Sequence, residues 1–149
     1  MANRWNLENT IETLMKLKPN TKPQWGSMSA QRMVEHLTDT IRVATGKNPQ
    51  PLLIPEDKIE KMQGFLETDK SMARNVEVPF APKNVALRNE DTELAIDEFV
   101  EEWILFEDLY NTNPALRTNH SFYGELNFQQ WQKLNDKHLN HHFEQFGLI

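Results

Sequence analysis

The chain of 149 residues contains no cysteine. Disulfides, zinc–thiolate sites, iron–sulfur clusters and thiol nucleophiles all require cysteine sulfur, so this one absence excludes all of them. Any metal site must therefore use histidine, aspartate, glutamate or water as ligands. That donor set suits a hard or borderline divalent ion.

The sequence contains no basic stripe of the kind that binds nucleic acid. The chain has 16 Lys and Arg against 22 Asp and Glu, which gives a formal net charge of −6, and the charges are interspersed. Binding to a phosphate backbone relies on many Lys and Arg contacts. We therefore do not expect a nucleic acid among the partners of this protein.

Long apolar runs are also missing. No stretch approaches the roughly 20 apolar residues that span a bilayer, and the N-terminal residues 1–5 begin no apolar signal-peptide core. We therefore expect a cytoplasmic protein with no membrane partner. Glycine-rich phosphate-binding loops and the Gly-x-Ser-x-Gly elbow are absent too, which argues against nucleotide-binding proteins and elbow-type hydrolases.

Helical periodicity dominates what is present. Apolar residues recur every three to four positions in four segments, at about 7–16, 30–45, 92–109 and 128–146. A shorter helix is expected at 56–66, and residues 76–80 could be extended. Because strand signals are few, we predict an all-α chain that forms a single domain over residues 1–149. The expected architecture is a four-helix bundle with one long crossover at 47–90.

The ends of two predicted helices carry recognisable signals. Ser29 and Asn127 are residue types that favour the N-cap position, directly before the second and fourth long helices. Gly46 and Gly147 follow the same helices at positions where glycine commonly ends a helix.

Three of the five histidines lie in one five-residue segment, 138–142, inside the last predicted helix. His138 and His142 are spaced i, i+4, which places their Cβ atoms roughly 5–6 Å apart on one helix face. At about 100° per residue, both fall on the same stripe as Trp131, Leu134 and Gln145, while His141 falls at its edge. This stripe is expected to face the interior of the bundle.

Two inward-facing imidazoles have two explanations. They can share one divalent ion, or they can be hydrogen-bonded core residues, because an unsatisfied buried polar group costs about 1–3 kcal/mol. The spacing alone leaves both open. His36 lies at the margin of the apolar face of the 30–45 helix, where a hydrogen-bonded core histidine is the commoner case. The zinc-protease motif is absent, because Leu139 stands where His-Glu-x-x-His requires glutamate.

Two segments together resemble DinB/YfiT-like proteins. Residues 25–37, ending in Met33-Val34-Glu35-His36-Leu37, resemble the start of that family's second helix, and residues 138–146 resemble its terminal His-x-x-His-His-x-x-Gln helix. Residues 120–126 resemble the preceding loop in an uncharacterised branch of the superfamily. The resemblance implies the same four-helix bundle. It also implies a divalent metal ion (zinc, nickel or manganese) held by His36, His138 and His142, with one coordination position open.

The resemblance also suggests a chemistry. It implies a metal-dependent enzyme acting on a small molecule, either a thiol-dependent S-transferase that uses a low-molecular-weight thiol or a related hydrolase. Such an ion would lower the pKa of a bound thiol or water. Gln145, His120 and Tyr123 are the residues that we expect to line the pocket.

Two alternatives stay open from the sequence. The first is a non-enzymatic metal-binding or stress protein on the same bundle, with a structural metal ion or none. The second is an interaction module that uses the 47–90 crossover as its contact surface. A homodimer interface built from that region would favour this alternative.

Overall fold

The computed structural model describes residues 4–74 and 85–149, and this part of the chain is largely all-α. The predicted extended segment at 76–80 lies outside the described residues. No helix in the described ranges is both long and apolar enough to cross a bilayer. The elements, in chain order, are α1 (Leu7–Leu14), α2 (Ala30–Ala44), the 3-10 helix η1 (Glu56–Lys58), α3 (Ile59–Leu66), α4 (Thr92–Thr112), β1 (Thr118–His120), β2 (Gly124–Leu126) and α5 (Phe128–Gln145).

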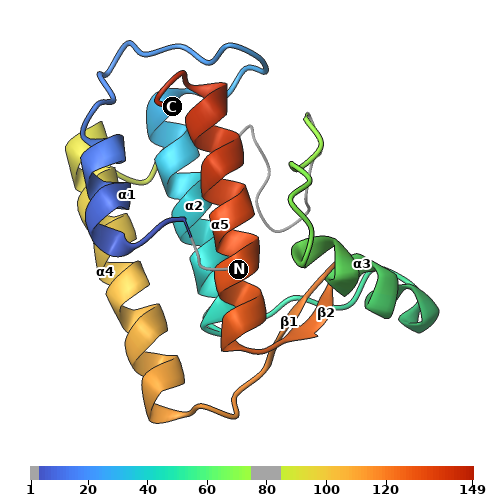
Figure 1. Ribbon diagram of the computed structural model, residues 1–149. Helices are drawn as coiled ribbons and strands as arrows, with labels where there is room; N and C mark the ends of the chain where they lie inside the picture. Colours follow the sequence, from blue (N-terminus) through green and yellow to red (C-terminus); the bar gives the residue numbers. More distant parts are fainter. Residues whose placement is uncertain (1–3, 75–84) are drawn as a thin grey trace.

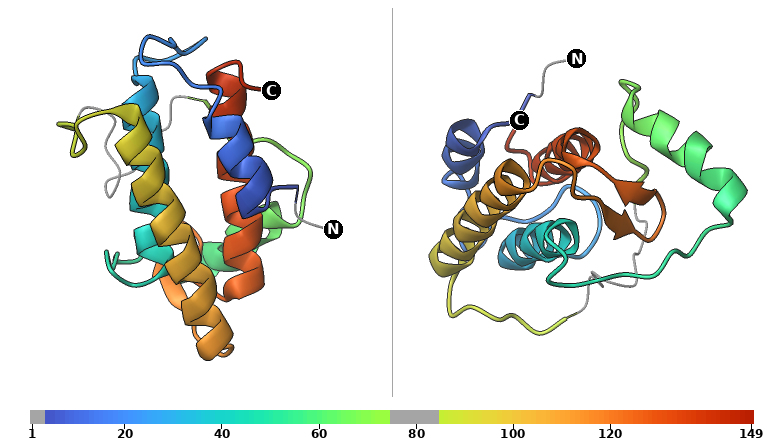
Figure 2. Two further views of the ribbon diagram at one scale, coloured as in Figure 1. Left: turned by 90° about the vertical axis from the view of Figure 1, so that its left-hand side faces the viewer. Right: turned by 90° about the horizontal axis from the view of Figure 1, so that it is seen from below.

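The helices α1, α2, α4 and α5 gather side by side, with α2 in contact with both α4 and α5 (Figure 1). The short helix α3 and the β1–β2 hairpin lie to one side of this group, next to the N-terminal half of α5 (Figure 2). The described part of the connection after α2 extends past the hairpin to α3, and residues 68 and 70 then contact Lys137 of α5.

The predicted helix signals are confirmed at both ends of α2 and α5. The Ser29 hydroxyl accepts a hydrogen bond from the Arg32 backbone N–H at 3.1 Å. The Asn127 side chain forms a reciprocal capping box with Gln130. Gly46 and Gly147 follow the two helices with φ of 80° and 66°, in the left-handed region that favours glycine.

The β1–β2 hairpin was not predicted, because residues 120–126 were expected to form only a loop before the last helix. The two strands pair antiparallel with His120 opposite Gly124. Each has only three residues, too few for a period-two pattern to be visible. Tertiary contacts hold the hairpin in place, since the Thr118 and Tyr110 hydroxyls both donate to the Ala44 carbonyl at 2.8 Å.

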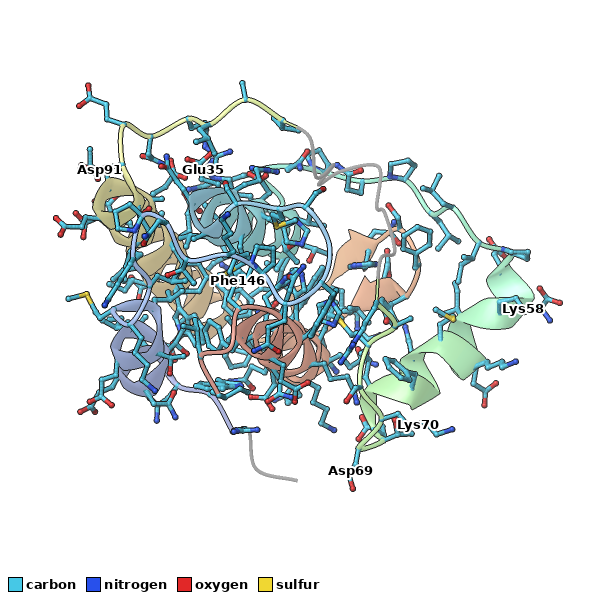
Figure 3. All side chains as sticks on the ribbon, turned by 90° about the horizontal axis from the view of Figure 1, so that it is seen from above. Glu35, Lys58, Asp69, Lys70, Asp91 and Phe146 are labelled. Atoms are coloured by element: carbon cyan, nitrogen blue, oxygen red, sulfur yellow. The ribbon has the colours of Figure 1, made fainter. Side chains whose placement is uncertain are left out.

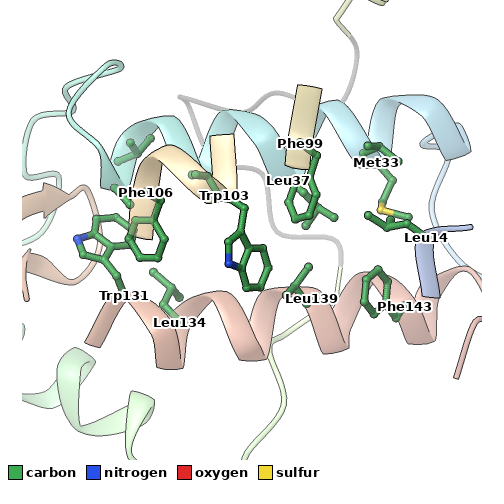
Figure 4. Close-up of a cluster of buried hydrophobic side chains, with 14 of the residues drawn as sticks. Leu14, Met33, Leu37, Phe99, Trp103, Phe106, Trp131, Leu134, Leu139 and Phe143 are labelled. Carbon is green, nitrogen blue, oxygen red and sulfur yellow. The ribbon is translucent and has the colours of Figure 1, made fainter. Parts of the chain in front are cut away.

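The core runs as a continuous stripe between α2, α4 and α5 (Figure 4). Trp131, Phe99 and Phe143 are its largest fully buried side chains, and Leu14 closes it from α1. Burial of a large apolar side chain contributes about 1.5–3 kcal/mol. The core therefore fixes the rotation of α5 about its own axis, and with it the direction in which the α5 histidines point.

A buried carboxylate anchors the returning end of the crossover. Glu35 on α2 is wholly buried and accepts hydrogen bonds from the backbone N–H groups of Arg88 at 2.8 Å and Asn89 at 3.1 Å. The Gln31 and Asn89 side chains add two further bonds at 3.2 Å. Figure 3 shows Glu35 on α2 beneath the chain that leads to Asp91. The crossover is thus attached to α2 directly beside His36.

We predict that Glu35→Ala lowers the free energy of unfolding by about 1–3 kcal/mol, because it leaves backbone donors without their acceptor. Urea denaturation measures the loss, and amide exchange at Arg88 and Asn89 should accelerate. Glu90→Ala, which changes an exposed glutamate in the same segment, is the matched control and should be nearly neutral. Equal stability of the two variants would contradict this role of Glu35.

The same carboxylate predicts a pH dependence. Burial raises the pKa of Glu35, but the hydrogen bonds from Arg88, Asn89 and Gln31 outweigh it and lower the pKa below its ordinary value. A group with a lower pKa in the folded state stabilises the fold above its ordinary pKa, and this contribution is lost as the pH falls through the folded value. The stability difference between wild type and Glu35→Gln should therefore be constant near neutral pH and shrink in acid. A difference that grows in acid would contradict the prediction.

Candidate metal centre

Three histidines from two distant helices converge inside the molecule. The Nε2 atom of His138 lies 2.9 Å from Nε2 of His36, although the two residues are 102 positions apart, and 3.0 Å from Nε2 of His142. Potential ligand atoms of all three residues lie within 4.8 Å of one another. These are the three residues that the sequence resemblance implies as metal ligands.

Local structure explains why these side chains meet. His138 and His142 are one turn apart on α5, and the buried Leu134, Leu139 and Phe143 set the rotation of that helix. His36 lies on α2, where most positions are buried. The three rings contact one another edge to face, with centroids 4.6–4.9 Å apart and planes inclined by 71–78°.

The electrostatics of the centre favour neutral imidazole. His36 and His142 are buried, and the ring of His138 is enclosed between them. Burial of this ring, reinforced by the neighbouring His142 and His36, lowers the pKa of His138 well below its ordinary value. A neutral ring keeps one nitrogen lone pair, which is the form of histidine that binds metal ions.

His141 lies outside the converging group, at the edge where the helical wheel places it. Its ring lies 4.9 Å from that of His142 and 5.8 Å from that of Trp25. It also lines a pocket of about 260 Å³ between α5 and residues 66–71. None of the three converging histidines lines this pocket, so it is separate from the centre.

Two lysines that line the outer pocket have protein partners. The Lys137 ammonium donates to the Thr68 and Lys70 carbonyls, both at 2.6 Å, and Lys133 pairs with Glu67. These contacts fasten the residues after α3 to the outside of α5. Sequence reasoning missed them, since nothing in a lysine's sequence context indicates that two backbone carbonyls will bind it.

The predicted pocket residues His120 and Tyr123 lie on the hairpin and are both buried. The His120 Nδ1 atom accepts a hydrogen bond from the Phe122 backbone N–H at 3.0 Å, and its ring lies 5.7 Å from that of Trp131. A charge on His120 would lower the pKa of His138, which places the hairpin within electrostatic range of the centre. Burial raises the pKa of Tyr123, so its hydroxyl stays protonated at neutral pH.

Gln145, the third predicted pocket residue, contacts a histidine of the centre directly. Its Oε1 atom lies 2.7 Å from Nδ1 of His142, and its Nε2 atom donates to the Trp25 carbonyl at 3.0 Å. The sequence placed Gln145 on the same stripe as His138 and His142. The part played by Trp25 was not predicted, because a backbone carbonyl in a loop leaves no sequence signal.

The fold and the site together define a largely helical protein with a candidate three-histidine metal centre. The model of the family described as "Protein of unknown function (DUF1569)" matches residues 4–147, so the chain belongs to that family. No curated protein and no solved structure matches the chain.

We predict that His120 stays neutral through the physiological pH range. Burial lowers its pKa to about 4, and the Phe122 N–H occupies Nδ1, so the ring proton lies on Nε2. A ring whose pKa is lower in the folded than in the unfolded state gives stability that is lost as the pH falls from about 6.5 towards 4. An NMR titration of the imidazole resonances measures this pKa. A midpoint near 6.5 would contradict the buried, neutral assignment.

Proposed function

We propose that the protein is a divalent-metal-dependent enzyme in which His36, His138 and His142 hold one zinc, nickel or manganese ion. The observation that carries the proposal is the convergence of three Nε2 atoms on one point between α2 and α5. Three protein ligands leave a coordination position for water or a small molecule, a pattern typical of catalytic sites.

The donor set fits such an ion. His138 Nε2 contacts two other ring nitrogens at 2.9 and 3.0 Å. If His138 Nε2 carries a proton, it can donate a good hydrogen bond to only one of these two nitrogens. If both neighbouring nitrogens carry protons instead, both must share the single lone pair of His138 Nε2. A cation instead accepts one lone pair from each ring. Nitrogen ligands of a tetrahedral zinc ion lie roughly 3.3 Å apart, given Zn–N bonds of about 2.0–2.1 Å, so small ring movements suffice.

The surroundings favour thiol transfer over base-assisted hydrolysis. A bound divalent ion would act as a Lewis acid that lowers the pKa of a thiol or water. The buried residues near the centre are poorly suited to act as a general base. His120 has a pKa of about 4, which makes it a weak base, and Tyr123 stays protonated. A thiol needs less help from a protein base than water does, because its own pKa is much lower. We therefore infer an S-transferase that joins a low-molecular-weight thiol to a small molecule.

The arrangement of the helices supports the proposal that the fold is a DinB-like four-helix bundle. The four helices α1, α2, α4 and α5 would form the bundle, and the connection from α2 to α4 would be its long crossover (Figure 2). The chain would then be one DinB-like domain, with the centre between the second and fourth helices of the bundle.

A non-enzymatic role has one observation in its favour. His36 and His142 are buried and belong to different helices, so an ion shared between them would tie α2 to α5 as a structural link. In that case metal binding would stabilise the fold without supporting turnover.

The metal proposal predicts one equivalent of divalent ion per chain after incubation with zinc, nickel or manganese, measured by elemental analysis. The double variant His138→Ala/His142→Ala should lose it, because one remaining imidazole cannot hold the ion. His141→Ala is the control on the same helix and should keep the full equivalent. A wild-type protein that stays free of metal after all three incubations would sink the proposal.

The enzymatic proposal predicts metal-dependent conjugation of low-molecular-weight thiols to a small electrophile such as 1-chloro-2,4-dinitrobenzene. Turnover should disappear on chelation and return when the ion is restored. If the ion raises the melting temperature but no thiol in the screen gives metal-dependent turnover, the structural alternative is correct instead.

A further inference from the structure

The amide of Gln145 can adopt only one orientation. Gln145 is the last residue of α5 and is buried, one turn after His142. One end of the amide faces the Trp25 carbonyl at 3.0 Å, and the other faces His142 Nδ1 at 2.7 Å. A carbonyl oxygen only accepts hydrogen bonds, so the end beside Trp25 must be the NH₂ group. The amide oxygen must therefore face His142.

This orientation sets the position of the proton on His142. An amide oxygen is an acceptor, so Nδ1 of His142 must carry the hydrogen that it receives. In the neutral ring the lone pair then lies on Nε2. That is the atom directed at His138. The backbone carbonyl of Trp25 thus determines, through one side chain, which nitrogen of His142 is available as a ligand.

A second hydrogen bond holds the same loop against the end of α5. The Gln24 backbone N–H donates to the Gln145 carbonyl at 2.7 Å, one of the carbonyls that a helix C-terminus leaves unpaired. The rings of Trp25 and His141 also meet edge to face, with centroids 5.8 Å apart. Residues 24 and 25 are therefore fixed to α5 beside the three histidines.

We propose that Gln145 is a positioning residue which, held by the Trp25 carbonyl, keeps His142 in the Nδ1–H form and so presents Nε2 as a ligand. The connection between α1 and α2 thereby becomes the outer support of the centre. The effect on metal affinity rests on the proposed function, whereas the proton position on His142 does not.

The test measures that proton position in the metal-free protein. Nitrogen-15 NMR of the histidine rings, at a pH where His142 is neutral, should show the Nδ1–H form in the wild type. Gln145→Met keeps the side-chain length but removes the acceptor, so the preference for Nδ1–H should be lost. Glu144→Gln, at the exposed neighbouring position, should leave the His142 spectrum unchanged.

Two results would overturn the proposal: a wild-type His142 that carries its proton on Nε2, or a Gln145→Met variant that retains the wild-type Nδ1–H preference. The wild-type spectrum decides the question even if Gln145→Met does not fold. In a parallel zinc titration, Gln145→Met should bind about 10–100-fold more weakly, as is typical when a ligand's supporting hydrogen bond is removed. Failure of the wild type to bind zinc would contradict the proposed function while leaving the His142 assignment intact.

Discussion

The packing of α2 against α5 is the constraint on which the rest of this structure depends. Only this contact brings His36 to within 2.9 Å of His138 across 102 residues of chain. The apolar stripe that includes Phe99, Trp131 and Phe143 fixes the two helices in rotation. Three polar rings are thus held together inside an apolar core, where each needs a partner for its nitrogens. The proposed shared cation would meet that need with donor atoms that already lie close together.

The contacts that support the candidate ligands follow from the same packing. Glu35 and His36 are adjacent on α2, and one binds the end of the crossover while the other joins the centre. On α5, Gln145 connects His142 to the loop that precedes α2. Both long connections of the chain are therefore fastened within one residue or one turn of a candidate ligand. The attachment of these two connections is therefore coupled to the positions of the candidate ligands.

Much of this could be predicted from the sequence, and the rest could not for physical reasons. Helical periodicity predicted the long helices, and capping residues such as Ser29 predicted where they begin. The i, i+4 spacing indicated that His138 and His142 share a face. His36 was different, because helical periodicity places it only at the margin of the apolar face of its helix. Its assignment as a candidate ligand came from the family resemblance. The hairpin, and the use of the Trp25 carbonyl, depend on tertiary contacts that have no local sequence pattern.

The central claim is that His36, His138 and His142 together bind one divalent ion, and X-ray absorption spectroscopy of the zinc-loaded protein tests it most directly. We expect three imidazole nitrogens at about 2.0–2.1 Å and one additional light-atom ligand in a tetrahedral site. His36→Ala should reduce the number of imidazole ligands by one, because it removes the proposed ligand on α2 and leaves the two on α5. A spectrum with fewer than three imidazole ligands in the wild type, or one that His36→Ala leaves unchanged, would contradict the account.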